Sequence, residues 1–130
     1  MNEITVVDAN LIFSILISDS EKIWRGFARK DITFVTPNFV IVELFQHFDR
    51  IKKASHLPEE KMFSIMSRIV ARLQFYGEVM ISTGSLVEAY RLCREVDPKD
   101  TPYVALALEL DAKFWTNDQT LKIGLVKKGL

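Results

Sequence analysis

Four short apolar segments alternate with stretches of helical periodicity along this chain. The first, Ile4-Thr5-Val6-Val7, is β-branched and does not alternate with polar residues, which is typical of a strand buried on both faces. Strands are also expected at residues 32–35, 79–81 and 114–116. Helices are expected at residues 9–29 with a break near 18–21, then at 38–53, 59–76, 85–95, 102–111 and 119–128. Strands that alternate with helices form βαβ units, so the sequence predicts an α/β fold with a parallel sheet.

The size of the chain is that of one domain. Its 130 residues are enough to bury a full hydrophobic core, and 48% hydrophobic and 26% charged residues are an ordinary globular balance. No apolar run reaches the ~18 residues of a membrane span, and the N-terminus lacks the basic start of a signal peptide. We therefore expect one soluble, cytoplasmic domain over residues 1–130. The single cysteine, Cys93, excludes an internal disulfide and a Cys-based zinc site, and is expected in the core.

The net charge is zero, because 17 basic residues balance 17 acidic ones. This balance argues against a simple polycationic nucleic-acid binder. If several of the acidic residues converge in one place, the rest of the surface is net positive. A local acidic pocket in a basic surround fits a metal-dependent enzyme that acts on a polyanion.

Five acidic residues lie at the ends of the expected segments. Asp8 closes the first strand, Glu43 lies in an apolar helical stretch, Asp97 and Asp100 precede an Ala/Leu-rich helix, and Asp118 follows the last strand. In open α/β sheets, sites form outside the carboxyl ends of the strands. Carboxylates in apolar surroundings are costly to desolvate without a partner, and no matching set of embedded Lys or Arg is present. A hard divalent cation is the natural partner, because Mg²⁺ and Mn²⁺ take oxygen ligands and leave positions open for a phosphate.

Most of these carboxylates also have a structural explanation. Asp8 is a favoured residue for the N-cap of the helix that follows it. Asp97 precedes a proline, as at many helix starts, and Asp100 could be stabilised by the dipole at a helix N-terminus. Asp118 could cap the last helix. Taken together, five acids at compatible ends of four segments favour a site.

Glu43 is harder to explain structurally. Its neighbours at i+3 and i+4 are Gln46 and His47, so its helix offers it no salt bridge at those positions. A glutamate inside an apolar stripe is rarely buried without a partner, which favours a functional role.

Four motifs carry a family resemblance: Val6-Val7-Asp8-Ala9-Asn10, Val42-Glu43-Leu44, Asp97-Pro98-Lys99-Asp100 leading into Ala105-Leu106-Ala107, and Trp115-Thr116-Asn117-Asp118. In order and spacing, the chain resembles the PIN-domain nuclease family, in the branch that includes VapC-like toxins of toxin–antitoxin pairs. The match spans nearly the whole chain. It implies a three-layer α/β/α fold with a central parallel sheet of four to five strands.

The resemblance also implies an activity and a set of site residues. The activity is a metal-dependent endoribonuclease that hydrolyses RNA phosphodiester bonds with Mg²⁺ or Mn²⁺. The family's acids match Asp8, Glu43, Asp100 and Asp118, with Asp97 as an accessory acid that is also a candidate metal ligand. The accompanying hydroxyl and amide residues match Asn10, Thr116 and Asn117. Pro102 departs from the family pattern, which leaves open how Asp97 and Asp100 divide their roles.

Partners and rival functions follow from the same motifs. The resemblance implies an RNA substrate, an antitoxin over the acidic groove and a homodimer, for which the helix at 59–76 is a candidate. Basic candidates for RNA contact are Arg50, Lys52, Lys53, Lys122, Lys127 and Lys128, although a solvated helix face explains each equally well. A phosphoacceptor receiver domain needs adjacent acids after the first strand, where Ala9 follows Asp8, and a haloacid-dehalogenase-type phosphatase needs an aspartate where Asn10 stands. A housekeeping RNA-processing nuclease and a non-catalytic PIN-like binding protein stay open as alternatives.

Overall fold

A parallel sheet forms the centre of the computed structural model, which describes residues 3–18 and 21–116. Its strands are β1 (Glu3–Val7), β2 (Ile32–Pro37), β3 (Leu73–Tyr76) and β4 (Lys113–Trp115). In the described part of the chain the order is β3-β2-β1-β4, and every pairing is parallel. In the middle of the sheet Val6 pairs with Val35 on one side and with Phe114 on the other. The predicted α/β fold with a parallel sheet is confirmed.

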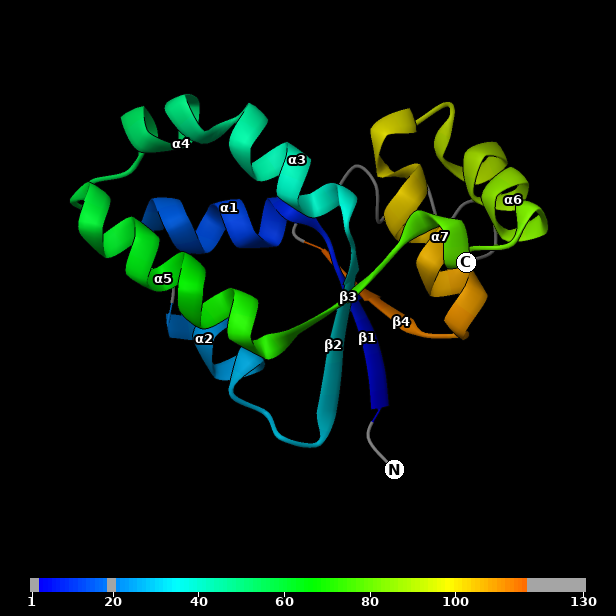
Figure 1. Cartoon of the computed structure of the whole chain (residues 1–130), viewed down its shortest axis with the longest axis horizontal. Helices are drawn as coiled ribbons and strands as arrows, with labels where there is room; N and C mark the ends of the chain where they lie inside the picture. The colour runs from blue at the N-terminus through cyan, green and yellow to red at the C-terminus, as the bar shows by residue number, and fades with distance from the viewer. Residues whose placement is uncertain (1–2, 19–20, 117–130) are drawn as a thin grey trace.

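Helices cover both faces of this sheet (Figure 1). They are α1 (Ala9–Ser18), α2 (Glu21–Phe27), α3 (Phe39–Gln46), α4 (Phe48–Ala54), α5 (Glu59–Arg72), α6 (Thr83–Cys93) and α7 (Thr101–Leu110), with short 3₁₀ helices η1 (Glu78–Met80) and η2 (Pro98–Asp100). Figure 1 shows α1, α2 and α5 on one side of the sheet and α6 and α7 on the other. The predicted three-layer arrangement is therefore present.

Two apolar helices, α1 and α7, contribute many of the buried core residues. Four aliphatic side chains of α1 are buried at 0–1% exposure: Leu11, Ile12, Ile15 and Leu16. On the other face, α7 buries the run from Val104 to Ala107. The two alanines in that run let α7 approach the sheet closely, because small side chains need little space between layers. Cys93 is fully buried in this core, as predicted.

The predicted boundary between the long helix and the third strand was wrong. The helix ends at Arg72, the strand occupies Leu73–Tyr76, and residues 78–80 form a 3₁₀ turn. The Arg72 guanidinium bonds the carbonyls of Phe27 and Arg29 at 2.8 and 2.9 Å, and Leu73 turns into extended backbone beside β2. When a short strand continues the apolar stripe of the preceding helix, periodicity alone does not show where the helix ends and the strand begins. Residues 79–81, where a buried strand was expected, include Val79, which is 92% exposed.

Smaller differences concern the remaining helices. The break predicted near residues 18–21 is confirmed, since α1 ends at Ser18 and α2 begins at Glu21. The helix expected to run to residue 53 is interrupted at His47, whose backbone leaves the helical region. The ring of His47 is half-buried with its edge toward Phe13, 5.8 Å between centroids, whereas His56 is exposed. The helix expected at 119–128 lies outside the described residues. Within the described ranges, no helix has the length and apolarity to cross a membrane.

Candidate functional site

Asp8 is a buried carboxylate at the carboxyl end of the central strand β1. It is 1% exposed and both of its oxygens accept hydrogen bonds. Oδ1 accepts from the backbone N–H of Leu11 at 3.0 Å, and Oδ2 accepts from the hydroxyl of Thr116. The first bond is a helix cap for α1, so the structural explanation of Asp8 holds. The second places the predicted accessory residue Thr116, which follows β4, beside the predicted acid.

Glu43 lies half-buried on α3, the helix that follows β2. Its Oε1 accepts a hydrogen bond from the hydroxyl of Tyr103 at 2.5 Å. Burial raises the pKa of the Glu43 carboxyl above its ordinary value, and the bond from Tyr103 and the charge of His47 oppose that rise. The negative charge of Asp97 raises the pKa of Glu43 further, and the positive charge of Lys99 lowers it.

Asp97 and Asp100 have different environments although they are only three positions apart in the sequence. Asp97 is the N-cap of η2, where its Oδ1 accepts from the N–H of Lys99 at 3.1 Å and Pro98 follows it. The capping explanation of Asp97 is therefore correct. Asp100 is only 6% exposed, and its side chain does not cap α7. Burial without a capping role favours Asp100 over Asp97 as the third acid.

Tyr103 bonds one of these acids, Glu43, and was not among the predicted site residues. Its side chain is 1% exposed, and its hydroxyl bonds Glu43. The pKa of Tyr103 is raised well above its ordinary value by burial, then by the bond to Glu43 and the negative charges of Glu43, Asp8 and Asp100. The Tyr103 phenol therefore lies in the electrostatic field of all three acids. The one local signal is its spacing, since Tyr103 stands about one helical turn after Asp100, and that spacing alone does not indicate a partner.

The arrangement of ligands is less complete than the sequence analysis predicted. Within residues 3–18 and 21–116, no three acidic, His or Cys side chains are grouped closely enough to hold a metal ion. Two predicted site residues, Asn117 and Asp118, lie outside the described residues. The chemistry of the described donors nevertheless fits a hard cation, because Asp8, Glu43 and Asp100 offer only carboxylate oxygens.

A pocket of about 450 Å³ extends between α1 and α4, close to Asp8 in sequence. It is lined by Asn10, Phe13, Ser14, Ile17, Arg50, Ile51 and Ala54. Asn10, predicted as an accessory residue, is exposed and lines this pocket. The pocket combines the Arg50 guanidinium and the polar side chains of Asn10 and Ser14 with apolar walls.

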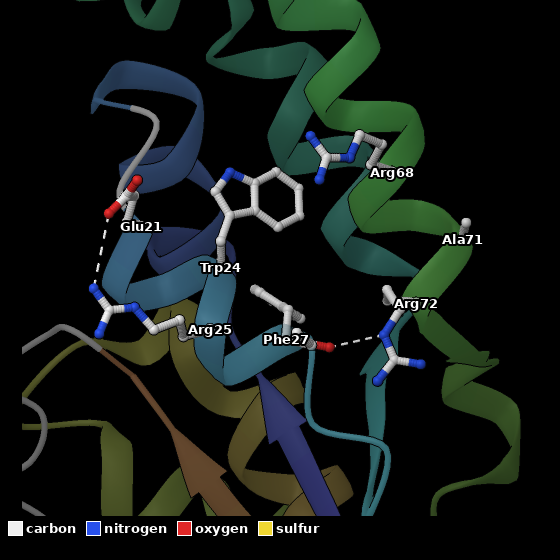
Figure 2. Close-up of a pocket in the computed structure, with 8 residues that line it drawn as sticks. Glu21, Trp24, Arg25, Phe27, Arg68, Ala71 and Arg72 are labelled. Carbon is white, nitrogen blue, oxygen red and sulfur yellow. Dashed lines mark hydrogen bonds and ion pairs between the residues drawn. The ribbon is translucent and has the colours of Figure 1, made fainter.

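A larger pocket of about 650 Å³ lies between α2 and α5 and has a different character (Figure 2). The Arg68 guanidinium lies over the ring of Trp24, 4.4 Å from its centroid. Its one acidic lining residue, Glu21, lies 3.7 Å from Arg25. None of the predicted site acids lines this pocket, so we do not place the candidate site there.

Comparisons with known proteins identify the family and the fold. A family model described as PIN domain matches residues 6–130. The fold is similar to that of a chain in the crystal structure of VapBC2 from Rickettsia felis bound to a DNA fragment from their promoter. That match has a TM-score of 0.72 and 17% identity, and covers 92% of each chain. It is also similar to the crystal structure of PAE2754 from Pyrobaculum aerophilum, with a TM-score of 0.65, 13% identity, and 95% of this chain and 79% of that chain covered.

A comparison with curated proteins gives no match. At identities of 13% and 17%, the two structures show similarity of fold. The family model covers nearly the whole chain, including Asp8, Glu43, Asp97 and Asp100. The chain belongs to the PIN-domain family.

Proposed function

We propose that this protein is a metal-dependent endoribonuclease that acts as the toxin of a toxin–antitoxin pair. The observation that carries the proposal is the position of three carboxylates at the carboxyl edge of the sheet. Asp8 and Asp100 are buried there, and Glu43 is bonded to a buried tyrosine that also lies in the field of the other two acids. Membership of the PIN-domain family supports nuclease activity, and the similarity of fold to VapBC2 supports the toxin role.

Asp8 and Asp100, with Asp118, would hold an Mg²⁺ or Mn²⁺ ion, and Asp97 would act as the accessory acid. A divalent cation in such a site lowers the pKa of a bound water and neutralises charge on the phosphate. The N–H of Leu11 and the hydroxyl of Thr116 would keep both oxygens of Asp8 in a fixed orientation. Oε2 of Glu43, which does not bond Tyr103, would complete the shell of the cation, or orient the attacking water and take its proton. A raised pKa suits the second of these roles, because a carboxylate that binds protons more readily is a better general base.

RNA would follow the pocket between α1 and α4 away from the acids. Arg50 lines this pocket and, within the described residues, forms no ion pair. Lys52 is less available because it bonds Glu59 at 2.7 Å, while Lys53 is exposed on the same helix. Arginine contacts to phosphates supply affinity that does not depend on sequence. We therefore assign phosphate binding first to Arg50.

The apolar surface supports a homodimer on different elements from those expected. α5 exposes Phe63, but that ring stacks on Phe48 of α4. Apolar side chains with larger exposed fractions than Phe63 lie on α3, η1 and α6: Val42 at 56%, Phe45 at 66%, Val79 at 92%, Met80 at 70% and Val87 at 62%. A bond of 2.7 Å from the N–H of Phe39 to Glu78 ties the start of α3 to η1. Exposed apolar groups of this kind mark protein interfaces. If these side chains form the dimer contact, Phe45→Glu should be a monomer when its mass is measured by light scattering.

The antitoxin would cover the acidic edge and so block access to the three carboxylates. Growth arrest on expression, relieved by the product of a neighbouring gene, would separate a toxin from a housekeeping RNA-processing enzyme. The basic test of activity is incubation of purified protein with a mixed single-stranded RNA, in Mn²⁺ or Mg²⁺ and in EDTA. Cleavage that requires the cation supports the proposal. No cleavage by folded protein that carries no inhibitor favours a PIN-like binding protein.

A further inference from the structure

We propose that Tyr103 is a positioning residue that holds the Glu43 carboxylate in one orientation toward the cation and the attacking water. This inference rests on the proposed function, because it concerns the same site. Tyr103 itself would touch neither RNA nor the cation; it would act through Glu43.

The first support is the geometry of one hydrogen bond. The Tyr103 hydroxyl donates to Oε1 of Glu43 at 2.5 Å, and the two residues are 60 positions apart in the sequence. Tyr103 is on the first turn of α7, whose N-cap is Asp100, whereas Glu43 is on α3. The bond therefore joins α3, which carries the second acid, to the helix that directly follows the third.

The second support is that Glu43 needs an orienting partner. A glutamate side chain has three rotatable bonds, and fixing them costs conformational entropy. Within the described residues, no lysine or arginine forms an ion pair with Glu43. A hydroxyl that donates to a carboxylate forms a short, strong bond, which occupies Oε1 and leaves Oε2 for the reaction.

The third support is that the bond between Tyr103 and Glu43 is shielded from solvent on the Tyr103 side. Because the Tyr103 side chain is 1% exposed, water does not compete freely for this bond.

A purely structural role is the rival explanation. A buried phenol needs an acceptor, and Glu43 would then merely satisfy it. The two explanations differ in what they predict for the phenylalanine variant. A structural bond affects only stability, whereas a positioning bond affects cation binding and turnover.

The test compares wild type with Tyr103→Phe, using Tyr76→Phe as a control that also removes one hydroxyl. Mn²⁺ affinity is measured by calorimetry, and kcat and KM are measured on RNA. Loss of an orienting partner to a metal ligand costs about 10- to 100-fold in affinity or activity. We expect weaker Mn²⁺ binding and a lower kcat for Tyr103→Phe, with KM for RNA nearly unchanged. Tyr76→Phe should behave as wild type.

Repeating the comparison in a Glu43→Gln background tests whether Tyr103 acts through Glu43. Glutamine retains an acceptor for the hydroxyl but lacks the charge. In that background Tyr103→Phe should cause no further loss of Mn²⁺ affinity. If Tyr103→Phe does not fold, Tyr103→Leu removes the hydroxyl by another route.

Wild-type Mn²⁺ binding and turnover in Tyr103→Phe would overturn the inference and leave the proposed function intact. An equal loss in the Glu43→Gln background would also overturn it, because Tyr103 would then act independently of Glu43. If the wild type itself neither binds Mn²⁺ nor cleaves RNA, the proposed function fails and the inference fails with it.

Discussion

The bond between Thr116 and Asp8 leads to a prediction about stability. Replacing Thr116 with valine keeps the shape of the side chain and removes the hydroxyl that donates to Oδ2 of Asp8. Both residues are 1% exposed, so a water molecule cannot easily take the place of the lost hydroxyl donor. Hydrogen bonds to charged groups contribute about 1.5–3 kcal/mol, and we expect Thr116→Val to lose roughly 2 kcal/mol of unfolding free energy. For a domain of this size, that loss lowers Tm by roughly 5–10 °C.

Urea denaturation followed by circular dichroism, in EDTA, measures this loss. The control is Thr83→Val, because Thr83 is exposed on α6 and surface substitutions change stability by less than about 0.5 kcal/mol. In an Asp8→Asn background the cost of Thr116→Val should fall, since the hydroxyl no longer faces a buried charge. Equal stability of Thr116→Val and wild type would refute the burial of Asp8 against Thr116.

Three further predictions address the site, the core and RNA binding. Burial raises the pKa of Glu43, so the ionised carboxylate destabilises the folded state at pH 7. Without divalent cations, Glu43→Gln should therefore have a higher urea midpoint than wild type at pH 7. A gain that persists unchanged below about pH 4, where the wild-type carboxyl is protonated, would contradict this explanation. Gly26→Ala would place a Cβ 2.4 Å from the Trp115 ring, so calorimetry should show a loss of about 1–3 kcal/mol, and an unchanged Tm would be inconsistent with this packing. Arg50→Gln should weaken RNA binding in EDTA and lower the slope of log affinity against log salt concentration by about one. Lys52→Gln should have a smaller effect, because Lys52 already pairs with Glu59 in the wild type. Equal effects of the two variants would exclude a special role for Arg50.

Local sequence patterns predicted the parts of the fold that depend on local chemistry. The β-branched run before Asp8 identified the central strand, and the alternation of segments identified the parallel sheet. Asp8 follows β1 and caps α1, as its sequence context predicted, and its second oxygen accepts from Thr116; its role in a site stays a prediction.

Features that depend on distant contacts were not predictable in the same way. Leu73–Tyr76 continues a helical stripe, and only its pairing with β2 makes it a strand. The different burial of Asp97 and Asp100, on which our preference for Asp100 rests, could not be read from the sequence. Tyr103 was missed because its partner lies 60 residues away, and no local pattern connects a tyrosine on α7 with Glu43 on α3.

Cleavage of single-stranded RNA by Asp8→Asn, measured beside wild type in Mn²⁺ and in EDTA, is the most direct test of the proposed active site. Asparagine retains an acceptor for the N–H of Leu11, so the fold and the start of α1 should be preserved. We expect the wild type to cleave only with the cation, and the folded variant to be inactive under both conditions. Full activity in the folded variant, or cleavage by wild type in EDTA, would contradict a metal-dependent site built on Asp8.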